Sequence, residues 1–296
     1  MAIASTGPSE GREGYVLIMT LVLIAVAALS VAGLARRSLL LATESIEAQQ
    51  ALQRRWGASS CRRLLLERAA EIFATLEAPH ATGKLLWPAP SRVATQVTLA
   101  GSTYRLWLAD EDAKLNLNQL RARLPQQEQE LLTQLVATAV PLQLRPETSN
   151  PARLQKRWFS SWGQVVDLRH AWNLGDLEPV IATTTSLTCW GSRQLNLRRV
   201  SDDLLRLVAS QAVTPEVGRK LLTARREATR LAWAELVKPL ALNRKDEQAL
   251  KLWFSDQSTC YSLWLELEEG PRRWYYQWVL GDRGSSAQEP VVSFQW

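Results

Sequence analysis

Residues 15–35 read YVLIMTLVLIAVAALSVAGLA and contain no charged side chain. As an α-helix this run would be roughly 30 Å long, which is the thickness of the hydrocarbon core of a bilayer. A secretory signal peptide has an apolar core of only about 7–15 residues, followed by a cleavage site of small residues. Because this run is longer and leads directly into Arg36-Arg37, it predicts a membrane-spanning helix.

The helical pattern continues beyond the apolar run. No proline occurs between Ser38 and Ala78, and Pro79 then ends the pattern. Apolar residues in this stretch recur at the spacing of one helix face: Leu65, Ala69, Ile72, Phe73 and Leu76. We therefore predict one helix from Tyr15 to Ala78, with its first third in lipid and the remainder along a globular domain.

The rest of the chain combines strand patterns with a helix-rich middle. Five segments read as strands: Val93–Ala100, Thr103–Ala109, Ser258–Leu267, Pro271–Leu280 and Val291–Trp296. Gly101-Ser102 and Glu268-Glu269-Gly270 are the expected turns of two hairpins. The stretch from Gln119 to Lys251 is rich in helix formers. The predicted fold is α+β, with a long helix packed on an antiparallel sheet and an all-α domain inserted between the second and third strands.

Composition narrows the classes of function. The net charge of +6 is spread over the chain with acidic residues interleaved, which favours a solvated basic surface over a dedicated nucleic-acid patch. The sequence contains no P-loop, dinucleotide-binding glycine pattern or HExxH motif. Cys189 and Cys260 could pair in an oxidising compartment, whereas Cys61 lies in a helical stretch and is expected to be buried.

The N-terminal boundary of the apolar run resembles a known processing signal. A short polar leader that ends in Gly14, followed by Tyr15 and a long apolar helix, is similar to the class III signal of type IV pilins and pseudopilins. The resemblance implies that prepilin peptidase cuts after Gly14 and methylates the new amine of Tyr15. Met19 is the fifth mature residue, where most pilins carry glutamate. The absence of that glutamate is a feature of the K-type minor pseudopilin of type II secretion systems.

The missing glutamate has a physical consequence. In a pilin filament this carboxylate is thought to neutralise the amine of an adjoining subunit in apolar surroundings, where an unpaired charge is expensive. A subunit with Met19 at this position lacks that pairing in one direction. It is therefore suited to the filament tip.

Further motifs extend the resemblance over nearly the whole chain. Ala109–Asn118 is similar to the strand-end pattern of the K-type family, and Trp162–Arg169 to a helix start. Leu195-Asn196-Leu197 is similar to the second Asn-x-Asn turn, with Arg198 in place of the second asparagine, and Val291–Trp296 to the last strand.

The resemblance implies a division of the chain into successive segments. These are a leader (1–14), a transmembrane part (15–35), a helix with the first hairpin (36–118), an inserted SAM-like or helix-hairpin-helix-like domain (119–251) and closing strands (252–296).

The implied function is assembly and not catalysis. A K-type subunit would be a single-pass protein of the bacterial inner membrane with its soluble domain in the periplasm. It would form a tip heterotrimer with the I- and J-type minor pseudopilins and contact the major pseudopilin and the inner-membrane assembly platform. Counting lysine and arginine near the membrane favours the opposite orientation, because Arg36-Arg37 follow the apolar run.

The acidic cluster Asp110, Glu111 and Asp112, with Asn116 and Asn118 after it, has two interpretations. Carboxylate and amide oxygens are the ligands that calcium prefers, so the cluster is a candidate calcium site. Alternatively these residues end a strand and bond to backbone groups at tight turns. The turn interpretation is favoured.

Two other classes of function stay open. Residues 196–226 resemble a helix-hairpin-helix unit of the kind that binds DNA phosphates through glycine N–H groups. The expected hairpin, Ser210-Gln211-Ala212-Val213, contains no glycine, which disfavours phosphate binding. A generic single-pass anchored periplasmic domain is the other alternative.

Overall fold

The computed structural model describes residues 10–77, 87–123, 159, 161–165, 184–227, 232–269, 272–281 and 292–295. The chain divides into two compact units, Met1–Gly57 and Ala58–Trp296. Helix α1 (Glu10–Leu65) supplies the first unit and continues into the second. The expected leader therefore overlaps the start of α1 from Glu10 onward.

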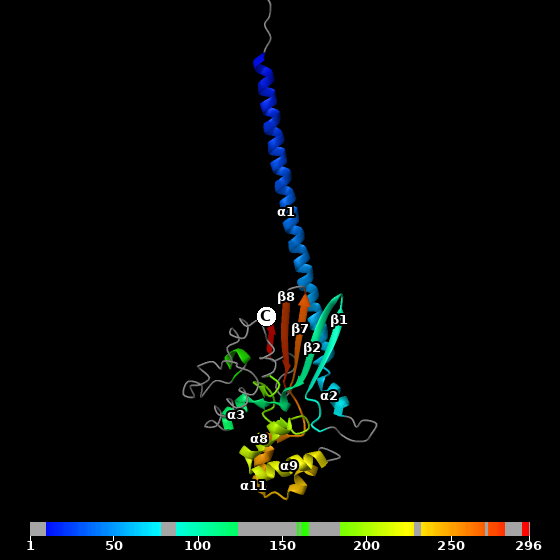
Figure 1. The fold of residues 1–296 in the computed structure, drawn as a ribbon, viewed down its shortest axis with the longest axis vertical. Coiled ribbons are helices and arrows are strands. Elements are labelled where there is room, and N and C mark those ends of the chain that lie inside the picture. Colours follow the sequence, from blue (N-terminus) through cyan, green and yellow to red (C-terminus); the bar gives the residue numbers. More distant parts are fainter. Residues whose placement is uncertain are drawn as a thin grey trace, which may run out of the picture. The chain divides into compact units, whose positions relative to one another are not determined.

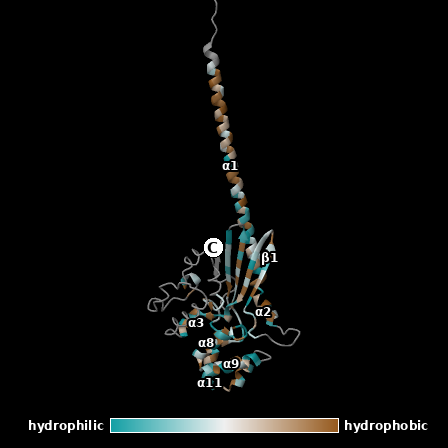
Figure 2. Cartoon of the chain, viewed as in Figure 1, coloured by the Kyte–Doolittle hydropathy of each residue, from teal (hydrophilic) through white to brown (hydrophobic). Residues whose placement is uncertain are grey.

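The N-terminal part of α1 exposes apolar side chains on all sides. Every residue from Gly14 to Gln50 is exposed, including the whole of the apolar run. Figure 2 shows the same part of α1 as the most continuously hydrophobic stretch of the ribbon. Among the described residues one helix, Gly14–Leu65, is long and apolar enough to cross a membrane.

The second unit is built on a five-stranded antiparallel sheet with the order β1-β2-β7-β8-β9 (Figure 1). Its strands are β1 (Arg92–Leu99), β2 (Ser102–Asp110), β7 (Tyr261–Glu269), β8 (Arg272–Leu280) and β9 (Val292–Gln295). The expected strands are present with shifted ends, and Glu268 and Glu269 belong to β7 instead of the turn.

The turn of the first hairpin lies one residue earlier than predicted. Arg92 pairs with Ala109 and Leu99 with Ser102, which leaves Ala100 and Gly101 as a two-residue turn. Both have positive φ, 50° and 83°. This is the type I′ geometry that matches the twist of the flanking strands.

One face of the sheet packs against helical residues from Ala58 to Phe73. Alternate residues of β2 and β7, among them Leu106 and Leu265, form a buried cluster with Phe73 and the last turns of α1. The ring of Phe73 stacks on Tyr261 with the centroids 5.7 Å apart. The period-2 pattern of the strands thus meets the helical pattern in one core.

The prediction of one uninterrupted helix to Ala78 was wrong. Helix α1 ends at Leu65, residues 66–68 form a turn, and α2 runs from Ala69 to Glu77. Glu67 and Arg68 have high helix propensity, so tertiary packing overrides local preference here. The break lets both Leu66 and Ala69 be buried against the sheet.

The segment between β2 and β7 contains most of the remaining elements. Its helices are α3 (Leu117–Arg123), α8 (Asp202–Ala212), α9 (Pro215–Glu227), α10 (Trp233–Val237) and α11 (Arg244–Trp253), with the 3-10 helices η1 (Glu111–Ala113), η3 (Trp162–Gln164) and η4 (Lys238–Leu240). Its short strands are β3 (Leu115–Asn116), β4 (Leu187–Thr188), β5 (Leu195–Asn196) and β6 (Phe254–Ser255).

The expectation of an all-α insertion was therefore incomplete. β3 pairs with β4 and β5 with β6, each in parallel. The boundary expected between residues 118 and 119 falls inside α3. Of the motif Trp162–Arg169, residues 162–164 form η3 and the part after Val165 lies outside the described residues.

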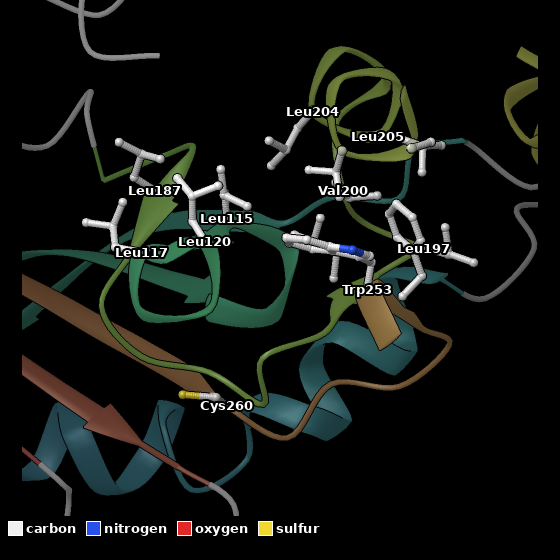
Figure 3. Close-up of a cluster of buried hydrophobic side chains, with 14 of the residues drawn as sticks. Leu115, Leu117, Leu120, Leu187, Leu197, Val200, Leu204, Leu205, Trp253 and Cys260 are labelled. Carbon is white, nitrogen blue, oxygen red and sulfur yellow. The ribbon is translucent and has the colours of Figure 1, made fainter. Parts of the chain in front are cut away.

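A second core joins these elements to the sheet. Figure 3 shows leucines of β3, α3, β4 and α8 gathered in one cluster with Trp253 of α11. Helix α8 contributes Leu204, Leu205 and Val208 to this cluster, and α9 contributes Leu221 and Leu222. Trp264 and Val279 of the main sheet belong to the same cluster.

Candidate functional site

Three consecutive carboxylates, Asp110–Asp112, lie at the end of β2 and form the acidic turn. These residues are only 0 %, 1 % and 2 % exposed. Carboxylates are rarely buried unless every oxygen has a partner. The partners of the acidic turn therefore define what it does.

Asp110 forms a buried ion pair with Arg199. Its Oδ2 lies 2.7 Å from Nη1 of Arg199 and accepts a hydrogen bond of 2.5 Å from the Ser258 hydroxyl. Nη2 of Arg199 lies 2.5 Å from Oε1 of Glu77 in α2. Burial lowers the pKa of Arg199, but the carboxylates of Asp110 and Glu77 outweigh it and raise that pKa. Arg199 therefore carries a full positive charge between two acids.

Glu111 accepts three side-chain hydrogen bonds. Nζ of Lys114 lies 2.5 Å from Oε1, which also accepts from the hydroxyl of Ser262 in β7. The hydroxyl of Thr188 in β4 donates to Oε2. Glu111 thereby connects the main sheet to the small β3–β4 sheet.

Asp112 accepts hydrogen bonds from the backbone of two loops. Its Oδ1 accepts from the N–H of Ser192 at 2.5 Å, and its Oδ2 from the N–H groups of Thr259 at 2.7 Å and Cys260 at 3.1 Å. Burial raises the pKa of Asp112 to about 6, against the lowering effect of the bond from Thr259, and the charge of Asp110 raises it further. Charge-assisted bonds to three backbone groups fix both loops to the end of β2.

The asparagines bond to nearby and distant backbone groups. Oδ1 of Asn116 accepts from the N–H of Asn118 at 2.9 Å, and Oδ1 of Asn196 accepts from the N–H of Arg198 at 2.9 Å. Each is an Asx-type turn. Nδ2 of Asn118 donates to the carbonyls of Phe159 and Cys189 at 2.9 and 2.8 Å. These amides satisfy buried backbone groups.

This geometry does not fit a calcium ion. Within the described ranges, no group of three or more His, Cys, Asp or Glu side chains is placed to hold a metal. The oxygens of the acidic turn are already occupied, because they accept from N–H, hydroxyl and cationic groups of the chain. A neighbouring cavity lined in part by Trp107, Lys114 and Trp264 has a volume of about 40 Å³. That is room for ordered water and far below the size of a ligand pocket.

The cysteines are buried free thiols in the structure. No bond joins Cys189 and Cys260, the pair considered from the sequence. Burial raises the pKa of both thiols, and the charge of Glu111 raises it further. Both groups stay protonated at neutral pH and are unsuited to act as nucleophiles.

Helices α8 and α9 form the helical hairpin expected from the sequence, with a shifted connection. Ser210 to Ala212 belong to α8, and Val213-Thr214 connect the two helices. Gly218 of α9 lies against α8, where an added Cβ would be 3.2 Å from that of Ala209. Gly218, the one glycine in α8 and α9, thus allows the two helices to pack closely.

Several basic residues of this hairpin have protein partners. Arg225 is fully buried, donates to the carbonyls of Leu197 at 3.1 Å and Val200 at 2.7 Å, and pairs with Asp202. Arg226 also pairs with Asp202, and Lys220 lies 2.9 Å from Glu216. A phosphate would have to compete with these acids, so the arrangement does not favour the DNA-binding alternative.

The expected processing residues lie on the exposed part of α1. Tyr15 is 64 % and Met19 47 % exposed, and their i, i+4 spacing puts them on one helix face. No heavy atom lies within 4 Å of a Cβ built on Gly14. The structure thus separates Gly14, Tyr15 and Met19 in the first unit from the acidic turn in the second.

Sequence reasoning missed the partners of the acidic turn. Arg199 and Arg225 lie in the stretch that resembles a DNA-binding unit, and both are buried cations with partners inside the second unit. Ser258 and Thr188 carried no signal, because they lie 148 and 77 residues from the carboxylates that they bond.

Comparison with known proteins gives one structural likeness to report. No family model matches the chain, and no curated protein matches it. The chain is similar to a chain in the crystal structure of the GspK–GspI–GspJ complex from the type 2 secretion system of enterotoxigenic Escherichia coli, with a TM-score of 0.44 and 14 % identity. The match covers 85 % of this chain and 97 % of the other. A likeness at this level does not assign a function.

Proposed function

We propose that this chain is a minor pseudopilin that caps the pseudopilus of a type II secretion system. It would be anchored in the bacterial inner membrane by α1, with the second unit in the periplasm. The observation that carries the proposal is α1 itself. Its exposed apolar run begins directly after Gly14 and has Met19 where most pilins carry glutamate. The C-terminal end of the same helix packs on a five-stranded antiparallel sheet.

The proposed work is assembly of a filament tip. The I- and J-type minor pseudopilins would bind beside this subunit, and the major pseudopilin would be added below it at the inner-membrane assembly platform. Two properties support a structural role. The buried carboxylates of the acidic turn are bonded within the chain, and the apolar residues of the first unit are exposed.

Met19 supplies the test of tip placement. We expect the wild-type chain to co-purify in detergent with the I- and J-type partners in equal amounts, and to cross-link only at the end of pseudopili. In Met19→Glu, a carboxylate at this position can pair with the amine of an adjoining subunit. This variant should enter the filament shaft and raise the ratio of this subunit to the major pseudopilin.

Leu23→Glu is the matched control, because Leu23 lies one turn further along the same exposed run and is 66 % exposed. It adds the same charge away from the fifth mature position and should not enter the shaft. Finding the wild-type chain along the whole shaft would exclude the tip assignment.

A further inference from the structure

Arg36 and Arg37 end the apolar run of α1, and the proposed function gives them no role. Both are exposed. On a helix, the neighbours of a side chain lie three and four residues away. For Arg36 these are Ala32, Gly33, Leu39 and Leu40, and for Arg37 they are Gly33, Leu34, Leu40 and Leu41.

No acidic side chain can therefore reach either guanidinium from the same face of α1. Three helical cations elsewhere in the described chain do have such a partner: Arg206 pairs with Asp203, Lys220 with Glu216 and Lys251 with Glu247. Within the described residues no ion pair involves Arg36 or Arg37. No acid on the same face of α1 therefore competes with an anion from outside the chain for this pair of cations.

The leucines around the pair define the environment in which that anion is found. Leu34, Leu39, Leu40 and Leu41 are 68 %, 69 %, 55 % and 57 % exposed. We call these four residues the leucine collar. Apolar side chains on both sides of a charge are typical of a helix at the boundary between hydrocarbon and headgroups, where a long cationic side chain extends to the polar layer.

The length of the run puts the pair at the depth of lipid phosphates. From Tyr15 to Arg36 the helix rises about 32 Å, which matches a hydrocarbon core of about 30 Å. With Tyr15 at one interface, where tyrosine is enriched, the two guanidinium groups lie at the other. A guanidinium binds a phosphate through two parallel N–H···O bonds.

We propose that Arg36, Arg37 and the leucine collar form a binding site for the phosphate of an anionic phospholipid, which fixes the depth of α1 in the bilayer. The inference rests on the membrane anchoring in the proposed function. It also gives the basic pair a role at the periplasmic face. Counting lysine and arginine favours the opposite orientation of the span, and a pair that binds lipid phosphate would explain why two arginines lie on this side.

The test measures lipid binding to the full chain in detergent by native mass spectrometry, with phosphatidylglycerol as the probe. The wild-type chain should bind phosphatidylglycerol at least about tenfold more tightly than phosphatidylcholine. Arg36→Gln/Arg37→Gln should lose this preference. Arg36→Lys/Arg37→Lys should retain part of it, because lysine keeps the charge and loses the bidentate geometry. Equal affinity of the lysine variant and wild type would contradict bidentate binding.

Arg54→Gln/Arg55→Gln is the matched control, since it removes the same charge from α1 beyond the collar and should keep the preference. Three results would overturn the site: an unchanged preference in Arg36→Gln/Arg37→Gln, an equal loss in the control, or displacement of the lipid by an equal concentration of inorganic phosphate. If the arginines bind acids of a second copy of α1 instead, their replacement would change self-association and leave lipid binding unaltered.

Flotation separates this inference from the anchor on which it rests. With phosphatidylcholine vesicles, wild type and Arg36→Gln/Arg37→Gln should both float. A wild-type chain that does not float would contradict the anchor. Chains that float without preferring phosphatidylglycerol would contradict only the lipid site.

Discussion

The apolar run of α1 and the acidic turn at the end of β2 are opposite in surface character. In the run, residues 15–35 present apolar side chains to the outside. In the turn, three carboxylates are all but inaccessible. The acidic turn finds its partners within the chain, in Arg199, Lys114 and the backbone of two loops. The apolar side chains of the run are not covered by any of the described residues.

The charged groups of the acidic turn are satisfied within the chain, whereas the apolar side chains of the run need lipid or another protein to cover them. A buried charge is tolerable only when its partners are fixed, so the acidic turn should govern the stability of the second unit. An exposed apolar helix is tolerable only in lipid or against other helices, so α1 should govern location and assembly. Substitutions in the acidic turn should change the free energy of unfolding of the second unit, and substitutions in the apolar run, residues 15–35, should leave it unchanged.

The largest effect is expected for Arg199→Met. It removes the cation between Asp110 and Glu77 and leaves the buried carboxylate of Asp110 without its counter-ion, at a cost of about 3–5 kcal/mol. Urea unfolding of the full chain in non-ionic detergent, followed by tryptophan fluorescence, measures the change. Arg206→Met is the control, because its pair with Asp203 is exposed and should matter by less than about 1 kcal/mol. Equal effects of the two variants would contradict the buried-pair account.

Asp112→Asn should lower the free energy of unfolding by about 2–4 kcal/mol, although it removes a buried charge. The amide has one oxygen, whereas both carboxylate oxygens accept from backbone N–H groups, so an NH₂ would face at least one donor. The same unfolding measurement applies. Asp203→Asn, whose side chain is 93 % exposed, is the reference. Wild-type stability in Asp112→Asn would show that these hydrogen bonds do not hold the loops.

Gly191→Ala should destabilise the second unit by about 2 kcal/mol. Gly191 has φ +107°, and an added Cβ would lie 2.8 Å from Oδ1 of Asp112. Gly101→Ala separates the two causes, because Gly101 also has positive φ but nothing lies within 4 Å of its Cβ position. We expect a smaller loss in that variant. If Gly191→Ala loses no more stability than Gly101→Ala, the contact with Asp112 does not contribute to the effect.

Titration of Asp112 should make the free energy of unfolding depend on pH, with a smaller effect than the substitutions above. Its pKa is raised from 3.8 to about 6 in the folded protein. Between these values the folded state holds a proton that the unfolded chain has released, so the free energy of unfolding falls as pH rises from about 4 to about 6. We expect a contribution of about 1–3 kcal/mol over this range. Urea titrations at several pH values should show that Asp112→Asn lacks it, and identical slopes in both proteins would contradict the assignment.

Sequence patterns predicted local features better than long-range ones. The apolar run and the hairpin strands follow from the pattern of hydrophobic residues, and both were found with small shifts. The break of the helix at residues 66–68 was missed, because Glu67 and Arg68 favour a helix and only packing of Leu66 on the sheet explains the turn.

The acidic turn was visible as a motif but its role was not. Asp110 and Asn116 end a strand and form turns, which local chemistry predicts. Several buried partners of the acidic turn come from segments 77 to 151 residues away, and pairing over such separations leaves no trace in a single sequence. A serine or threonine in a loop looks the same whether or not a carboxylate meets it.

The state of the mature N-terminus tests the central claim, that the exposed run of α1 is a pseudopilin anchor. Intact-mass and peptide analysis of the chain from its own membrane should find residues 1–14 removed and Tyr15 methylated. Gly14→Val should block the cut, and Gly33→Val should not. The two variants are matched because a Cβ at either glycine meets nothing within 4 Å, so neither should disturb the structure. An intact Met1, or a cut near residue 35, would contradict the account.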